Sequence, residues 1–298
     1  MTWTNGHHRR GFGGGRNPSW SRRIRRAWSI SSAITTGPAV LQIIPALDAG
    51  GAERTTIDIA RALTHAGLGA LVATKGGRLE PQLESAGGEI VHLPLDSKAP
   101  HRMLGNALRI GTVAIDHNVK VIHARSRAPA WSAFVAAWLV KVPFVTTYHG
   151  IYNASNALKR FYNSIMVRSD AIIANSQWTA DHIVEEHGIA RDKIHVVPRG
   201  VDFAEFDPPK VGADRVRAMR AAWRAKDGDV VVLLPGRLTR WKGQLVLIAA
   251  LAELRRTAKL GNVRAVLLGD AQGRDDYVAE LRTAIAADGL EDRVLIAP

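Results

Sequence analysis

From residue 38 onward, short apolar segments alternate regularly with segments whose apolar residues recur at helical spacing. The first kind is typical of buried strands and the second of helices that cover a sheet. Their alternation predicts an α/β fold with parallel sheets. The predicted strands span 40–47, 69–74, 89–93, 120–123, 144–148, 171–175 and 194–198, then 230–235, 263–268 and 293–297. The predicted helices span 53–66, 79–86, 103–117, 128–140, 158–168 and 176–187, then 212–225, 243–258 and 275–287.

A stretch with three prolines, Val197 to Pro209, separates the two series and is predicted to be a linker. A chain of 298 residues also exceeds the usual size of a single core, which favours two domains. We therefore expect a Rossmann-like domain over 38–205 and a partial one over 206–298. The second is expected to be incomplete because a doubly wound sheet usually has five or six strands.

Positive charge is concentrated before the first predicted strand. The net charge is +13, and residues 1–37 hold seven arginines and no acidic residue. These residues predict a disordered basic arm, which could contact an anionic membrane surface, and an arm without function fits equally well. The arm has no apolar core of a signal peptide, and no run in the chain could span a bilayer. We expect a cytoplasmic protein, at most peripheral on the inner face of the cytoplasmic membrane.

The loop from Gly236 to Gly243 is the strongest indication of a binding site. It follows a predicted strand, precedes a predicted helix, and contains Arg237 and Lys242. The start of a helix offers unpaired N–H groups and a partial positive charge, so two nearby cations make a site for an anion such as a diphosphate. The order of residues differs from that of a Walker A loop.

A second loop of this kind opens the first series. Gly50 and Gly51 follow the strand predicted at 40–47 and lie just before the next helix. Bare glycine backbone there could approach a phosphate or a sugar closely, although a glycine pair is also ordinary turn chemistry. Two such loops, one in each half, predict a diphosphate held between two domains.

Other polar residues follow strand ends, where the ligands of open α/β sheets bind. A single histidine at such a place is more often structural, but several together favour a site. The residues concerned are His123, Arg125, His149, Asn175, Arg199 and Gly269.

Several other classes of site are excluded by the sequence. Cysteine is absent, which removes disulfides, thiol nucleophiles and cysteine-ligated zinc. There is no H-E-x-x-H motif and no legible Ser–His–Asp arrangement. No helix-turn-helix, RRM or zinc-finger pattern occurs, so we expect no nucleic acid as a partner.

Four short motifs occur in one order: G-G-A-E at 50–53, His149-Gly150, the P-x-G-V-D segment at 198–202, and G-R-x-x-x-x-K-G at 236–243. This ordered set resembles the family-4 retaining glycosyltransferases over residues 38–298. The resemblance implies the GT-B fold, in which two Rossmann-like domains face each other. The segment from His123 to Pro129 also resembles, more weakly, proteobacterial members that build lipopolysaccharide core or other envelope glycans.

The resemblance implies a role for each candidate residue. Arg237 and Lys242 would bind the diphosphate of a nucleotide sugar and stabilise the leaving group, and His149 would hydrogen-bond the sugar. Gly50, Gly51, Gly236, Gly243 and Gly269 would line the donor site, and His123 and Arg125 would face the acceptor. The acceptor would be a cell-envelope glycan or a lipid-linked saccharide. Neither a metal nor another cofactor is expected.

The sequence also departs from the family pattern. The family has an acidic E-x-x-x-x-x-x-x-E segment about a hundred residues after the basic loop, beyond the last residue here, and Arg199 stands where asparagine is commoner. We therefore expect donor binding with feeble catalysis, and an exposed edge at the strand 293–297. Two alternatives remain open: a truncated, non-catalytic GT-B remnant that binds nucleotide, and a GT-B sugar-nucleotide epimerase.

Overall fold

The computed structural model describes residues 37–97, 99–152, 154–203 and 206–297. The chain forms two compact units, Met1–Gly200 (unit 1) and Val201–Pro298 (unit 2), so that the division falls within the stretch predicted to be a linker. The predicted basic arm lies almost wholly outside the described residues. Within the described part of the chain, no helix combines the length and the apolar character needed to cross a membrane.

Unit 1 is built on one parallel sheet of seven strands, which confirms the predicted α/β class. Its strand order is β3-β2-β1-β4-β5-β6-β7, so the order reverses between β1 and β4. The strands are β1 Ala39–Ile43, β2 Gly69–Thr74, β3 Glu89–His92, β4 Val119–Ala124, β5 Phe144–Tyr148, β6 Ala171–Ala174 and β7 Ile194–Val196.

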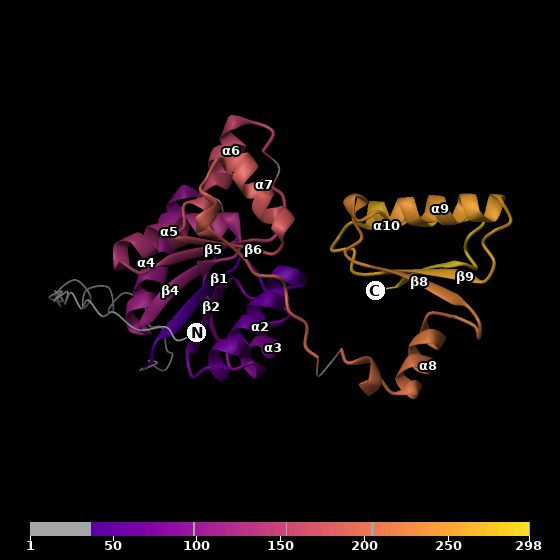
Figure 1. Cartoon of the computed structure of the whole chain (residues 1–298), viewed down its shortest axis with the longest axis horizontal. Coiled ribbons are helices and arrows are strands. Elements are labelled where there is room, and N and C mark those ends of the chain that lie inside the picture. Colours follow the sequence, from indigo (N-terminus) through magenta and orange to yellow (C-terminus); the bar gives the residue numbers. More distant parts are fainter. Residues whose placement is uncertain (1–36, 98, 153, 204–205, 298) are drawn as a thin grey trace, which may run out of the picture. The chain divides into compact units, whose positions relative to one another are not determined.

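Helices cover both faces of this sheet (Figure 1). Two of them, α2 (Gly51–His65) and α3 (Glu80–Ser85), pack on one face over the smaller apolar cluster. The larger cluster, on the other face, includes residues of α4 (Pro100–Asp116) and α5 (Arg127–Val140). The remaining helices of unit 1 are α6 Ala157–Asn163, α7 Gln177–His187 and the short 3₁₀ turns η1 Ser164–Val167 and η2 Arg191–Lys193.

The pleat of β1 explains how a polar side chain enters this core. Leu41 and Ile43 belong to the larger cluster on the α4 and α5 side, and Gln42 points to the opposite face. Gln42 is fully buried, and its amide donates to the backbone oxygen of Thr56 in α2 at 3.0 Å. A buried amide must be paired, so this contact fixes α2 against the strand that leads into the glycine loop.

Unit 2 contains three parallel strands in the order β10-β9-β8, namely β8 Val230–Pro235, β9 Val263–Leu268 and β10 Val294–Ala297. Its longer helices α9 (Gln244–Arg256) and α10 (Asp275–Ala287) share one apolar cluster with the strands and lie on the same side of them (Figure 1). The other helical segments are η3 Pro208–Lys210, α8 Ala213–Ala222 and η4 Arg240–Lys242.

The structure differs from two predicted elements of unit 1. The strand predicted at 40–47 ends at Ile43, and Ile44 and Leu47 pack into the core from a loop that contains Pro45, which lacks a backbone donor for a strand. The helix predicted at 158–168 is divided into α6 and η1. Ile165 and Met166 of η1 are fully buried, so they are core residues and do not extend an apolar surface with the rest of the segment.

The second sheet has two edges among the described residues. One is β10, as predicted for the strand at 293–297, and the other is β8, where Val230 is 54% and Leu233 40% exposed. Among the described residues β8 pairs only with β9, whereas its counterpart β1 in unit 1 lies between two strands. Hydrophobic periodicity identifies strands but does not give their order, and the order determines which strands lie at the edges of a sheet.

Because a flat apolar edge favours association between chains, Leu233→Lys is expected to weaken self-association several-fold. Sedimentation velocity over a range of concentrations measures the effect. Val246→Lys is the matched control, because Val246 is 73% exposed and lies on the helix α9, so it is not part of a strand edge. Equal association of the two variants would show that β8 is not the surface responsible.

Candidate functional site

The carboxyl edge of the first sheet brings five sequence-predicted residues together. The sheet order reverses between β1 and β4, and in open α/β sheets this reversal creates a crevice for ligands. Gly50 and Gly51 follow β1, Arg125 follows β4, and His149 follows β5. Arg199, in the segment after β7, returns to the same place, as its contacts show.

The glycine pair shapes the start of α2. Gly50 has a φ of 152° and is the N-cap residue, and no side chain caps this helix among the described residues. Its first N–H groups are therefore available to an anion. The constraint at Gly51 is different, because a Cβ there would overlap the guanidinium of Arg199, which would have to move.

Arg125 is a buried cation, only 2% exposed. Its Nη1 donates to Gln42 Oε1 at 3.1 Å, while Nε and Nη2 have no hydrogen-bond partner among the described residues. Burial, and then the charge of Arg199, lower the pKa of Arg125 to about 10. The side chain therefore stays charged at neutral pH, and its charge is only partly offset by Asp58 and Glu53.

His123 lies deeper and is enclosed. It is 5% exposed, and its Nε2 lies 2.7 Å from Thr147 Oγ1 on the neighbouring strand β5. Burial holds the pKa of His123 well below its usual range, and the nearby Arg125 and His149 act in the same direction. His123 is thus a neutral residue beneath the crevice, between Arg125 and the β5 strand.

His149 has one ring nitrogen in contact with Arg199 and one without a partner among the described residues. Its Nδ1 lies 3.3 Å from Arg199 Nη2, and its buried Nε2 has no partner among the described residues. Burial, with Arg125 and then Arg199, lowers the pKa of His149 to about 3. The imidazole is therefore neutral throughout the physiological range.

In unit 2, the loop from Gly236 to Gly243 places two cations against one aromatic ring. The guanidinium carbon of Arg237 lies 5.8 Å and Lys242 Nζ 4.4 Å from the centroid of Trp241. Trp241 is itself 68% exposed. Neither cation forms an ion pair within the described residues, so both are available to an anionic ligand at the start of α9.

The backbone of this loop is fixed by buried contacts. Gln244, fully buried at the start of α9, donates to the backbone oxygen of Arg237 at 3.0 Å and accepts from Tyr277 Oη at 3.2 Å. Gly243 has a φ of 83°, which favours glycine where the loop enters α9. Arg240, by contrast, is paired with Glu280 at 2.6 Å and is occupied.

Gly236 and Gly269 occupy neighbouring loops after β8 and β9. A Cβ at Gly269 would overlap the backbone oxygen of Gly236, and the φ of Gly269 is 154°. The backbone N–H of Gly236 also donates to Leu268 at 2.8 Å. The close approach of two backbones is thus sufficient to require glycine at position 269.

Two contributors to the site were not selected from the sequence. Gln42 was read as part of an apolar strand, although a polar residue within such a run is the available signal. Trp241 lies within the predicted loop, and an aromatic residue between two cations is the available signal for a ring that orients them. Arg199 was noted only at a strand end and as a departure from asparagine, and its reach to Gly51 requires the fold.

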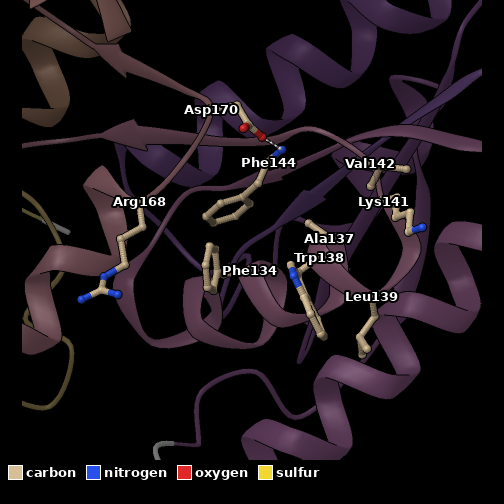
Figure 2. A pocket seen from close by; sticks show the side chains of 9 residues that line it. All are labelled: Phe134, Ala137, Trp138, Leu139, Lys141, Val142, Phe144, Arg168 and Asp170. Carbon is tan, nitrogen blue, oxygen red and sulfur yellow. Dashed lines mark hydrogen bonds between the residues drawn. The ribbon is translucent and has the colours of Figure 1, made fainter. Parts of the chain in front are cut away.

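The described residues also contain a cavity of about 490 Å³ that is distinct from these loops. Figure 2 shows the rings of Phe134 and Phe144 next to each other in it, with Arg168 on one side and Lys141 on the other. Phe144 begins β5, so the cavity lies at the amino edge of the sheet, away from the glycine loop. Asp170 is engaged with the backbone N–H of Phe144 at 2.8 Å.

No group of three or more His, Cys, Asp or Glu residues suited to holding a metal ion occurs within the described residues. The candidate sites contain cations instead. Arg125 and Arg199 lie at the crevice of unit 1, and Arg237 and Lys242 lie in the loop before α9 in unit 2. Such groups can bind and stabilise a diphosphate by charge alone.

Comparison with known proteins gives a consistent result. A family model described as Glycosyltransferase Family 4 matches residues 49–205. A D-inositol 3-phosphate glycosyltransferase of Xylanimonas cellulosilytica is 28% identical over 277 residues, which cover 84% of this chain and 65% of the relative. The chain thus spans just under two thirds of the length of that curated relative.

Two solved structures share the arrangement of elements. A glycosyltransferase from Rickettsia africae superposes with a TM-score of 0.76 at 32% identity, over 88% of this chain and 68% of that protein. The Anabaena protein Alr3699/HepE, solved with UDP-glucose, gives a TM-score of 0.73 at 26% identity over 87% and 68% of the two chains. The α/β architecture with a seven-stranded and a three-stranded parallel sheet is therefore that of GT-B proteins.

The depressed histidine pKa values predict a loss of stability in acid. Below about pH 6.5 the unfolded chain protonates His149, whereas the folded chain does so only near pH 3, so unfolding takes up a proton and is favoured as pH falls. His149 thus contributes a slope of up to about 1.4 kcal/mol per pH unit over that window, and His123, whose pKa is also lowered, acts in the same direction.

Urea unfolding of the full chain between pH 4 and 7, compared with His149→Gln and His123→Gln, measures these contributions. Each substitution is expected to flatten the fall of the unfolding free energy towards acid pH. A slope unchanged in both variants would mean that neither histidine is held neutral by the fold.

Proposed function

The chain belongs to glycosyltransferase family 4, and on that basis we propose that it serves the transfer of a sugar from a nucleoside-diphosphate sugar to an acceptor hydroxyl, with retention of configuration. The observation that supports this most is the pair of cations, Arg237 and Lys242, on the ring of Trp241 at the start of α9. They suit a diphosphate, because they combine two full charges with the N-terminus of a helix.

The role of this loop in the reaction is electrostatic. As the bond between the sugar and the diphosphate breaks, negative charge grows on the leaving group. Arg237 and Lys242 would stabilise that charge without a metal ion, and a preorganised donor of this kind contributes on the order of 2–4 kcal/mol to the transition state. The acceptor hydroxyl would then attack from the same face, within an ion pair, which gives retention.

In unit 1, the carboxyl edge of the sheet has groups that suit a sugar. The uncapped start of α2 at Gly50 and Gly51 offers N–H donors, and His149 presents a ring nitrogen without a partner among the described residues. His123 and Arg125 would act from beneath the crevice on the acceptor side, because both are almost wholly buried. Arg125 would supply positive charge beneath the acceptor, and the neutral His123 would help to fix the shape of the crevice.

For the donor we propose a UDP-sugar, because a related protein with the same arrangement of elements was solved with UDP-glucose. For the acceptor we propose a cell-envelope glycan or a lipid-linked saccharide, in lipopolysaccharide or polysaccharide biosynthesis. The support is the weaker resemblance of the segment from His123 to Pro129 to proteins of that kind. The relative matched above is named for D-inositol 3-phosphate, which makes this compound a useful comparison acceptor.

The first test is nucleotide binding by the full chain. Arg237→Ala and Lys242→Ala are each expected to weaken UDP or UDP-glucose binding about 10- to 100-fold, because each removes a charged hydrogen bond worth about 1.5–3 kcal/mol. Isothermal titration calorimetry measures the change. Arg240→Ala is the matched control, because Arg240 lies in the same loop but is paired with Glu280. Binding equal to the parent in both variants would refute the diphosphate site.

We also propose peripheral contact with an anionic membrane, which a lipid-linked acceptor would require. Helix α6 exposes Leu158 (76%) and Phe161 (56%). The Phe161 ring lies 5.4 Å from the ring of Trp131, and the guanidinium of Arg168 lies 5.5 Å from Phe161. Apolar and aromatic groups beside cations suit the interface of an anionic bilayer.

Replacing both Leu158 and Phe161 with glutamate is expected to reduce sedimentation with vesicles of anionic lipid at low salt. Apolar contact and charge attraction are lost together. Val246→Glu on α9 is the control for added negative charge at an exposed apolar site. Sedimentation that is the same with neutral and anionic vesicles would count against membrane contact.

A further inference from the structure

Arg199 makes two contacts at the crevice of unit 1. Its guanidinium occupies the space left free by Gly51, where a Cβ would overlap it. Its Nη2 lies 3.3 Å from Nδ1 of His149. The arginine therefore extends from the segment after β7 to both the glycine loop and the end of β5.

The chemistry of arginine decides which way the hydrogen bond to His149 runs. A guanidinium has N–H donors and no acceptor, so Nδ1 of His149 must accept. A neutral imidazole that accepts at Nδ1 holds its hydrogen on Nε2. That nitrogen is buried and has no partner among the described residues, so its N–H is a donor left unpaired by them.

The charges that face His149 maintain this state. Arg199 contacts its ring, Arg125 lies beside it on the β4 side, and His123 is near as well. The carboxylates Glu53 and Asp58 act on Arg125 instead. Two cations and a buried position oppose protonation of His149, which leaves only the neutral ring with one N–H.

We propose that Arg199 is the positioning residue for His149: it fixes the imidazole as the tautomer with hydrogen on Nε2, and Gly51 leaves the space in which it does so. His149 then donates a hydrogen bond to a ligand oxygen, such as a hydroxyl of the transferred sugar, and this last step rests on the proposed function. Arg199 acts through His149 and is not itself a catalytic residue.

The length of the side chain matters to this role. An asparagine side chain at this position would be several bonds shorter and would carry no charge. It could neither fill the space over Gly51 in the same way nor oppose protonation of His149. Lysine keeps the charge, the reach and a donor.

The test uses ligand-free, ¹⁵N-labelled full-length protein, with the His149 ring signals assigned by their loss in His149→Gln. The wild type is expected to show hydrogen on Nε2 and no protonation of His149 above about pH 4, in keeping with a pKa of about 3. Arg199→Asn should raise the pKa of His149 and produce a mixture of the two tautomers.

Two further variants separate positioning from a general effect on the fold. Arg199→Lys should restore most of the wild-type pH profile. Gly51→Ala should reproduce Arg199→Asn, because the methyl group displaces the guanidinium without removing its charge from the chain. Arg191→Asn is the matched control, since Arg191 lies in η2 of the same unit and faces Asp181 at 3.8 Å.

Hydrogen on Nδ1 in the wild type, or a His149 pKa and tautomer unchanged in both Arg199→Asn and Gly51→Ala, would overturn the proposal. These measurements need no nucleotide or acceptor. A failure to bind UDP-glucose would therefore count against the proposed function and leave the role of Arg199 standing, and the reverse holds as well.

Discussion

The positive charge buried at Arg125 is the constraint on which the first site depends. An ionised group in a protein interior is costly unless it is paired, and the guanidinium of Arg125 has only one hydrogen bond, to Gln42, among the described residues. That bond continues through Gln42 to the backbone of α2, so the charge is tied to the glycine loop. Burial, together with this charge, keeps the neighbouring histidines neutral, so that the crevice offers donors and positive charge to a ligand rich in oxygen.

The site in unit 2 uses cations in a different way. Arg237 and Lys242 are held on the exposed ring of Trp241, in a loop whose backbone is anchored by the buried Gln244 and Tyr277. The charges thus remain accessible to solvent while the loop beneath them is fixed. A fixed backbone with accessible charge reduces the reorganisation needed when negative charge grows on a leaving group. Arg240, only a few residues away, shows the contrast, because its pairing with Glu280 removes it from this role.

Most of the fold could be predicted from the sequence, because buried parallel strands form continuous apolar runs and their helices keep one apolar face. Loops after strands likewise identified Arg237, Lys242, His149 and the glycines as candidates. The contact between the Arg199 guanidinium and Gly51 could not be predicted, because it depends on the path of the segment after β7. Nor could the exposure of β8, which follows from strand order, or the burial of Ile165 in a 3₁₀ turn within a segment that has the periodicity of a helix.

The most direct test of this account is a crystal structure of the chain with UDP-glucose at saturating concentration. The account predicts diphosphate oxygens within hydrogen-bonding distance of Arg237 and Lys242. A diphosphate bound elsewhere, with both cations free of it, would contradict the account.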